Sequence, residues 1–145
     1  MFVLADATLH AHMSEIPVGR YKKAHRHIDG FHIFQLTGFG YSLYWNEGQP
    51  PERVDWSYGM VHGPMYFQWH QHFNLSDEPA RYMAIALGSI RYPFSSVSMA
   101  GWQRQSEADS PNQIEYADED PEIAATFERE LQAAKARGGA SSGAI

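Results

Sequence analysis

The sequence contains no cysteine. This absence excludes disulfide bonds, a thiol nucleophile, iron–sulfur clusters and cysteine zinc sites, so any metal must be held by nitrogen or oxygen ligands. Long apolar runs are also missing, and none approaches the roughly 18–20 residues of a membrane-spanning helix. The N-terminal stretch MFVLADATLH lacks the basic region and apolar core of a signal peptide. A cytoplasmic protein without a membrane partner is therefore expected.

Basic residues are too few to predict a nucleic-acid-binding surface. The 145 residues include 11 Lys and Arg against 17 Asp and Glu, for a formal net charge of -6. Residues 1–106 hold 8 basic and 8 acidic side chains, whereas residues 107–145 hold 3 and 9. The body is thus neutral and lacks the clustered cations that displace counterions from nucleic acids. A small molecule is the expected partner.

Most of the chain is predicted to form short strands. Aromatic and β-branched residues gather in five segments that are separated by Gly, Pro, Asn and Asp, namely Gly19–His27, Phe31–Thr37, Tyr41–Trp45, Tyr66–Asn74 and Arg81–Ala86. Short strands at such intervals are typical of a β-sandwich or barrel. A chain of this length suits one domain, with the barrel at 1–105.

The acidic C-terminal part is predicted to contain one helix. Acidic residues and Pro121 precede apolar residues at helical spacing, and Lys135 and Arg137 suit the negative end of the helix dipole. Gly138-Gly139 is expected to end this helix. Residues 106–137 are thus assigned to an acidic linker and helix of the same domain, and residues 138–145 to a flexible tail.

The histidines form the most informative pattern. His25 and His27 are two residues apart, as are His70 and His72, so each pair projects to one face of a strand. If the two strands are neighbours, four imidazoles meet inside the barrel. Burial of several imidazoles without a partner is costly, and neutral imidazole is a common ligand of Fe, Mn, Ni, Cu and Zn. The pattern therefore predicts a site for one divalent transition metal.

At these residues the chain resembles the cupin superfamily. Gly19, His25, His27 and Gly38 resemble the first cupin motif, and the segment Trp69–Asn74 resembles the second, although Phe67 stands where glycine is usual. The resemblance covers about residues 15–90. It implies an all-β fold, the double-stranded β-helix or cupin jelly roll, here with a C-terminal α-helix. It also implies that His25, His27 and His70 bind the metal.

His32 stands where the first motif usually has glutamate. Either the site uses three histidines or His32 is a fourth ligand. His72 is interpreted as a catalytic acid or base, or as a hydrogen-bond donor to substrate. Six further side chains are candidates for substrate binding, namely Gln35, Phe34, Tyr44, Trp69, Phe67 and Arg81. Dimers are common among cupins, so a homodimer is expected.

The segments around the two histidine pairs are similar to those of gentisate-type ring-cleaving dioxygenases, which use three histidines and ferrous iron. We therefore expect an Fe(II) dioxygenase, an oxidoreductase, acting on a small aromatic or enolisable oxygenated substrate. Those relatives are more than twice this length, so their substrate does not transfer. A non-redox metallocupin (a polyketide cyclase, isomerase, decarboxylase or lyase) is the first alternative. A non-catalytic small-molecule-binding cupin is the second.

Overall fold

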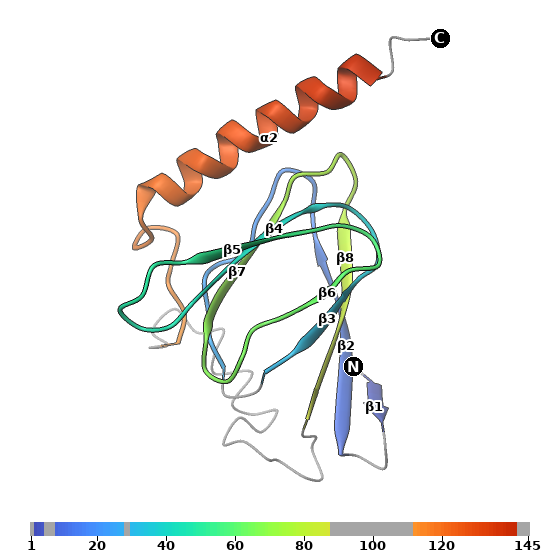
Figure 1. The fold of residues 1–145 in the computed structure, drawn as a ribbon, viewed down its shortest axis with the longest axis vertical. Helices are drawn as coiled ribbons and strands as arrows, with labels where there is room; N and C mark the ends of the chain where they lie inside the picture. The colour runs from blue at the N-terminus through green and yellow to red at the C-terminus, as the bar shows by residue number, and fades with distance from the viewer. Residues whose placement is uncertain (1, 5–7, 28–29, 88–111, 142–145) are drawn as a thin grey trace.

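Two antiparallel sheets and one helix form the described part of the chain (Figure 1). The computed structural model describes residues 2–4, 8–27, 30–87 and 112–141, with side chains of the last helix as far as residue 137. One sheet has the strand order β1-β2-β8-β3-β6, with β1 at Phe2–Leu4, β2 at Leu9–Ile16, β8 at Ala80–Leu87, β3 at His32–Gln35 and β6 at Val61–His62. The other has the order β5-β4-β7, with β5 at Glu52–Trp56, β4 at Gly40–Trp45 and β7 at Trp69–Asn74.

The core of the barrel contains inward-facing side chains of both sheets. Ile33, Tyr82 and Ala84 come from the larger sheet and Trp56 from the smaller one, and all are at most 5% exposed. Along β3 and β8 buried and more exposed residues alternate, as the two-residue period of a strand requires. One face of the larger sheet therefore closes the barrel.

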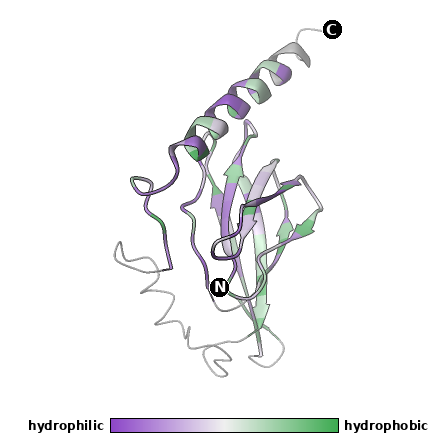
Figure 2. Cartoon of the chain, turned by 60° about the vertical axis from the view of Figure 1, so that its left-hand side comes forward, coloured by the Kyte–Doolittle hydropathy of each residue, from purple (hydrophilic) through white to green (hydrophobic). Residues whose placement is uncertain are grey.

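The helix α2 covers the outer face of the smaller sheet. It spans Pro121–Ser141, and hydrophobic and hydrophilic residues alternate along it (Figure 2). Phe127, Leu131 and Ala134 pack against Tyr41 and Phe73. This cover buries Phe73 of β7 from the outer side.

Two predicted boundaries differ from the structure. The helix continues past Gly138-Gly139 to Ser141, because a glycine in a helix costs only about 1 kcal/mol and does not forbid it. Residues 142–145 of the predicted tail lie outside the described residues. The predicted strand Gly19–His27 pairs with β7 only through the isolated bridges Tyr21↔Phe73 and His25↔His70.

No helix in the described ranges is long and apolar enough to cross a membrane.

The segment beside β7 contains one extra residue, which determines what faces the barrel. Tyr21 and His25 are four positions apart, but their partners Phe73 and His70 are only three positions apart. Such an insertion is a β-bulge, and it reverses the alternation of side chains beyond it. Tyr21 stacks on Phe73 beneath α2, with ring centroids 5.0 Å apart. His25 instead faces the interior beside His70, with ring centroids 4.2 Å apart.

Candidate metal site

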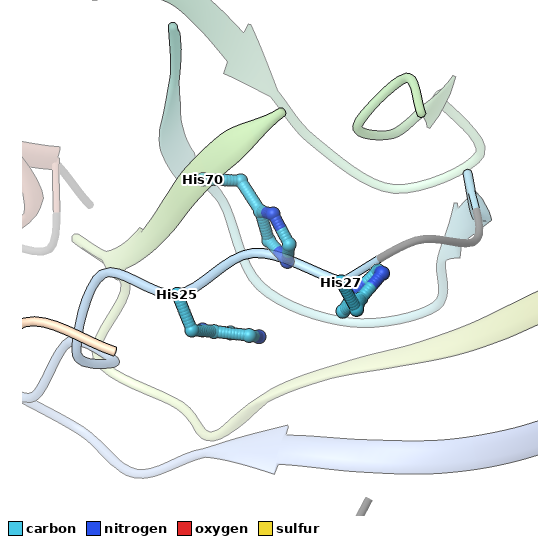
Figure 3. A group of neighbouring side chains, drawn as sticks. All are labelled: His25, His27 and His70. Carbon is cyan, nitrogen blue, oxygen red and sulfur yellow. The ribbon is translucent and has the colours of Figure 1, made fainter. Parts of the chain in front are cut away.

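Three histidines converge inside the barrel (Figure 3). His70 extends from β7, and His25 and His27 extend from the bulged segment beside it. One ring nitrogen of each lies within 4.8 Å of one nitrogen of each of the others. Nitrogens that share one ion at about 2.1 Å lie roughly 3–4 Å apart. Small side-chain rotations therefore suffice to bring the three onto one ion.

The backbone orients two of these rings. The Nδ1–H group of His25 donates to the carbonyl of Lys23, and that of His70 donates to the carbonyl of Gln68, each at 3.0 Å. The segments are joined by two backbone hydrogen bonds between His25 and His70, at 3.0 and 2.9 Å. With the proton on Nδ1, the lone pair is on Nε2, which is the arrangement of histidine ligands in metal sites.

Burial keeps the imidazoles of His25 and His70 neutral. It lowers the pKa of His25 to about 4, although the hydrogen bond to the Lys23 carbonyl partly opposes this effect. Burial also lowers the pKa of His70 well below its usual value, and the nearby His25 and His27 lower it further. Neutral rings have available lone pairs, and three nitrogen donors suit a divalent transition metal. The residues present therefore fit the metal that the sequence predicts.

Arg26 supports this segment from outside the barrel. Its guanidinium carbon lies 4.4 Å from the ring centre of Phe67 and 4.5 Å from that of Trp69. Its Nη1 donates to Glu47 at 2.7 Å, and its Nε donates to the Asn112 side chain at 3.1 Å. Since Arg26 lies between two of the three histidines, these contacts restrain the backbone that carries both.

Phe67 has a left-handed backbone, with φ of 53°. This conformation favours glycine, because a Cβ atom crowds the backbone there. The observation agrees with the usual glycine at this place in the second cupin motif. The backbone N–H of Phe67 also donates to the carbonyl of His27 at 3.1 Å. Phe67 is therefore a support of the histidine segment.

His72 lies beside the three histidines but outside their group. Its ring centroid is 5.5 Å from that of His70. Its Nδ1 lies 2.7 Å from Ser42 Oγ, which also accepts the indole N–H of Trp56 at 2.9 Å. Burial lowers the pKa of His72 well below its usual value, and Lys22 lowers it further. A neutral, hydrogen-bonded His72 at the site is compatible with the predicted role in proton transfer.

His32 is exposed, on the face of β3 opposite the buried Ile33. It is not part of the three-histidine group. The reason is strand alternation, which turns position 32 outward when positions 33 and 35 face the core. The arrangement in the described residues is thus that of a three-histidine site, the first of the two forms that the sequence left open.

A small cavity of about 50 Å³ lies over the histidines. None of the six predicted substrate-binding residues is among the residues that line it. Gln35 is buried and donates to the Thr37 carbonyl, while Phe34 lies on the opposite face of β3. Arg81 pairs with Glu15 on the surface. Tyr44 comes nearest, since its ring centroid lies 6.5 Å from that of His70 and its hydroxyl contacts His62 at 2.6 Å.

Trp69 and Phe67 lie outside the barrel, where both rings pack against the guanidinium group of Arg26. Sequence reasoning missed four polar residues that do line the cavity, namely His12, Ser14, Lys22 and Tyr82. The signal for two of them was the alternation of His10, His12 and Ser14 on one strand face. That strand, β2, lies between β1 and β8. His12 therefore faces the cavity.

Comparison with known proteins establishes the fold. Neither a protein-family model nor a curated protein matches the sequence. Among solved structures, the chain is similar to two structures of Bacillus subtilis oxalate decarboxylase. One comes from a study of the Mn(II) centres of that enzyme, and the other is a tryptophan-to-phenylalanine variant. Both have a TM-score of 0.54 and 16% sequence identity, and the match covers 57% of this chain and 22% of that chain. Oxalate decarboxylase is a cupin.

This chain has a cupin fold. The predicted double-stranded β-helix with a C-terminal helix is therefore confirmed. At 16% identity the likeness establishes the cupin fold, and neither the metal nor the substrate of the decarboxylase is transferred with it. The matched region is less than a quarter of that enzyme's length, at 22%. Within this fold, His25, His27 and His70 form a group that could hold a metal ion.

Proposed function

We propose that this protein is a metal-dependent enzyme, an Fe(II) dioxygenase acting on a small, oxygenated, enolisable substrate. The observation that carries the proposal is the meeting of His25, His27 and His70 within 4.8 Å in the floor of a cavity. Three nitrogen ligands leave coordination positions open, as catalytic metal sites require. A bound iron ion would supply Lewis-acid polarisation of the substrate and redox chemistry with O₂.

The chain's own residues would bind, orient and exclude water. His25 and His70 present their Nε2 atoms because their Nδ1–H groups are held by carbonyls. The apolar side chains of Phe31, Ile33 and Pro64 line the cavity and limit its hydration. His72 would exchange a proton or a hydrogen bond with substrate.

Cavity size supports the enolisable substrate over the aromatic one. The cavity measures about 50 Å³, whereas an engineered protein cavity that accepts benzene measures about 150 Å³. A compound of a few carbon atoms with adjacent oxygens matches the smaller space. The polar groups beside the histidines also suit the oxygen atoms of such a compound better than an aromatic ring without substituents.

A non-redox reaction is the second candidate, with the metal acting as Lewis acid. Its support is the small polar cavity, which suits a carboxylic acid, together with the shared fold of an enzyme described as an oxalate decarboxylase. Decarboxylation, isomerisation, cyclisation or a lyase reaction would each use the same three histidines.

The first experiment is metal analysis of protein purified without chelator. We expect about one divalent ion per chain, and iron supports dioxygenation. The double variant His25→Ala/His70→Ala should lose the ion, while His32→Ala should keep it, because His32 is exposed and outside the group. Retention of metal by the double variant would disprove the site.

The second experiment separates the reactions. Iron-loaded protein is given 2-hydroxy acids, β-diketones and catechols in an oxygen-electrode cell. Uptake of O₂ with one of the first two classes supports the proposal. Product formation under anaerobic conditions would favour the non-redox candidate. Metal-loaded protein that converts none of them but melts at a higher temperature with one is a binding protein.

A further inference from the structure

Lys22 lines the cavity and has no carboxylate partner within the described residues. The adjacent Lys23 pairs with Glu115 on the outside, and Arg26 pairs with Glu47. Lys22 instead donates from Nζ to the hydroxyl oxygen of Tyr82 at 2.6 Å and lies 4.9 Å from the centre of that ring. A phenol provides no negative charge to balance the ammonium group.

The bulge beside β7 places Lys22 and the metal-binding histidines around one space. The backbone N–H of Lys22 donates to the carbonyl of His72 at 2.9 Å, so Lys22 lies directly beside β7. Tyr21 faces α2, and Lys22, the next residue, therefore faces inward. After the extra residue, His25 faces inward as well. Without the bulge, Lys22 and His25 would face opposite sides of the sheet.

The positive charge acts on the cavity. Burial lowers the pKa of His12 to about 4, and Lys22 lowers it further. Burial lowers the pKa of His72 as well, and the positive charge of Lys22 lowers it further. None of the described side chains that line the cavity is acidic. A divalent ion on the histidines would add two further positive charges, so the cavity is strongly suited to an anion.

We propose that Lys22 and Tyr82 form the anion-binding part of this cavity and that the substrate is a small carboxylate or enolate. This inference rests on the proposed metal site and names its substrate class. Because the hydroxyl oxygen of Tyr82 accepts from Lys22, its own hydrogen is free to point at a ligand. The ammonium group has further N–H donors. The two groups would hold one anionic end, while adjacent oxygens face the histidines.

Glycolate and glycolamide test this proposal, because they share a shape and differ in charge. Binding is measured by calorimetry on metal-loaded protein, with metal content determined for every sample. Wild type should bind glycolate more tightly than glycolamide. Lys22→Met should raise the Kd for glycolate about 10- to 100-fold, as loss of a charge-assisted hydrogen bond predicts. Glycolamide binding and metal content should not change.

Three variants serve as controls. Lys23→Met removes the neighbouring lysine, which faces outward towards Glu115, and should bind glycolate as wild type does. Lys22→Arg keeps the charge and should retain most of the affinity. Tyr82→Phe removes one donor and should cause a smaller loss than Lys22→Met. It also tests the pair if Lys22→Met does not fold.

The outcomes separate this proposal from the metal site. If metal-loaded Lys22→Met binds glycolate as tightly as wild type, the anion site is wrong and the metal site stands. If wild type takes up no metal, the metal site is wrong. The anion site is then tested on metal-free protein by the glycolate-dependent rise in melting temperature. A rise that Lys22→Met abolishes supports it, and no rise in wild type overturns it.

Discussion

Buried neutral histidines should make the metal-free protein sensitive to mild acid. His25 has its pKa lowered from 6.5 to about 4, chiefly by burial. Between these two values the unfolded chain binds the proton and the folded chain does not. The free energy of unfolding must therefore fall as the pH drops from about 6.5 to about 4, and it gains nothing from this group above pH 6.5.

The size of the effect follows from linkage. At pH 5 the difference of about 1.5 units from the unfolded pKa corresponds to about 2 kcal/mol for His25 alone. His70 and His72 act in the same direction, because burial lowers the pKa of each. A domain stable by about 5–15 kcal/mol would lose a large part of that margin. Glu47, Glu115 and Glu122 have pKa values below 4.5, so their contributions are lost only at lower pH.

The assay is urea unfolding with chelator at pH 7.5, 6.0 and 5.0, followed by tryptophan fluorescence. His25→Gln should reduce the loss of stability between pH 7.5 and 5.0 by about 2 kcal/mol. His32→Gln, at an exposed position, is the matched control and should not change it. If wild-type protein is equally stable at pH 7.5 and 5.0, the histidines are not buried in neutral form and the reasoning fails.

Three other substitutions test the supports of the site. Arg26→Ala should weaken metal binding about tenfold while the chain stays folded, because the segment between His25 and His27 loses its outer contacts. Equilibrium dialysis with a coloured chelator measures the metal affinity, and an unchanged affinity would contradict the supporting role of Arg26. Phe127→Ala should lower the free energy of unfolding by about 3–5 kcal/mol in chemical denaturation, since this ring is 4% exposed beneath the sheet. Gly40→Ala should prevent normal folding, seen as loss of soluble protein or of strand signal in circular dichroism, because its Cβ atom would lie 1.9 Å from the carbonyl oxygen of Phe73.

Local patterns in the sequence predicted the parts of the site that lie on one regular strand. The alternation on β7 turns His70 and His72 to the interior, and the structure buries both there. The same alternation turns Gln71 and Phe73 outward. In the structure Phe73 lies under α2, and Gln71 donates to Glu119 at 3.0 Å.

The substrate-binding residues could not be chosen by composition alone. Aromatic residues are abundant in a small barrel, and each can lie in the core, under the helix or on the surface. Trp69 illustrates this, because its strand neighbour His70 faces inward and Trp69 must therefore face Arg26 outside. Which face of each strand is the inner one depends on the partner strands, and no single segment contains that information.

The sequence by itself predicted imidazole ligands, because the histidines occur in pairs at strand spacing and the absence of cysteine excludes thiolates. It also predicted the strand that carries His70. Only the tertiary structure decided that His25 faces His70, because one extra residue reverses the side-chain alternation after Tyr21. The same bulge turns Lys22 inward, and strand pairing brings His12 and Tyr82 to the same cavity. These contacts depend on the pairing register of strands that are far apart in the sequence, so no single segment predicts them.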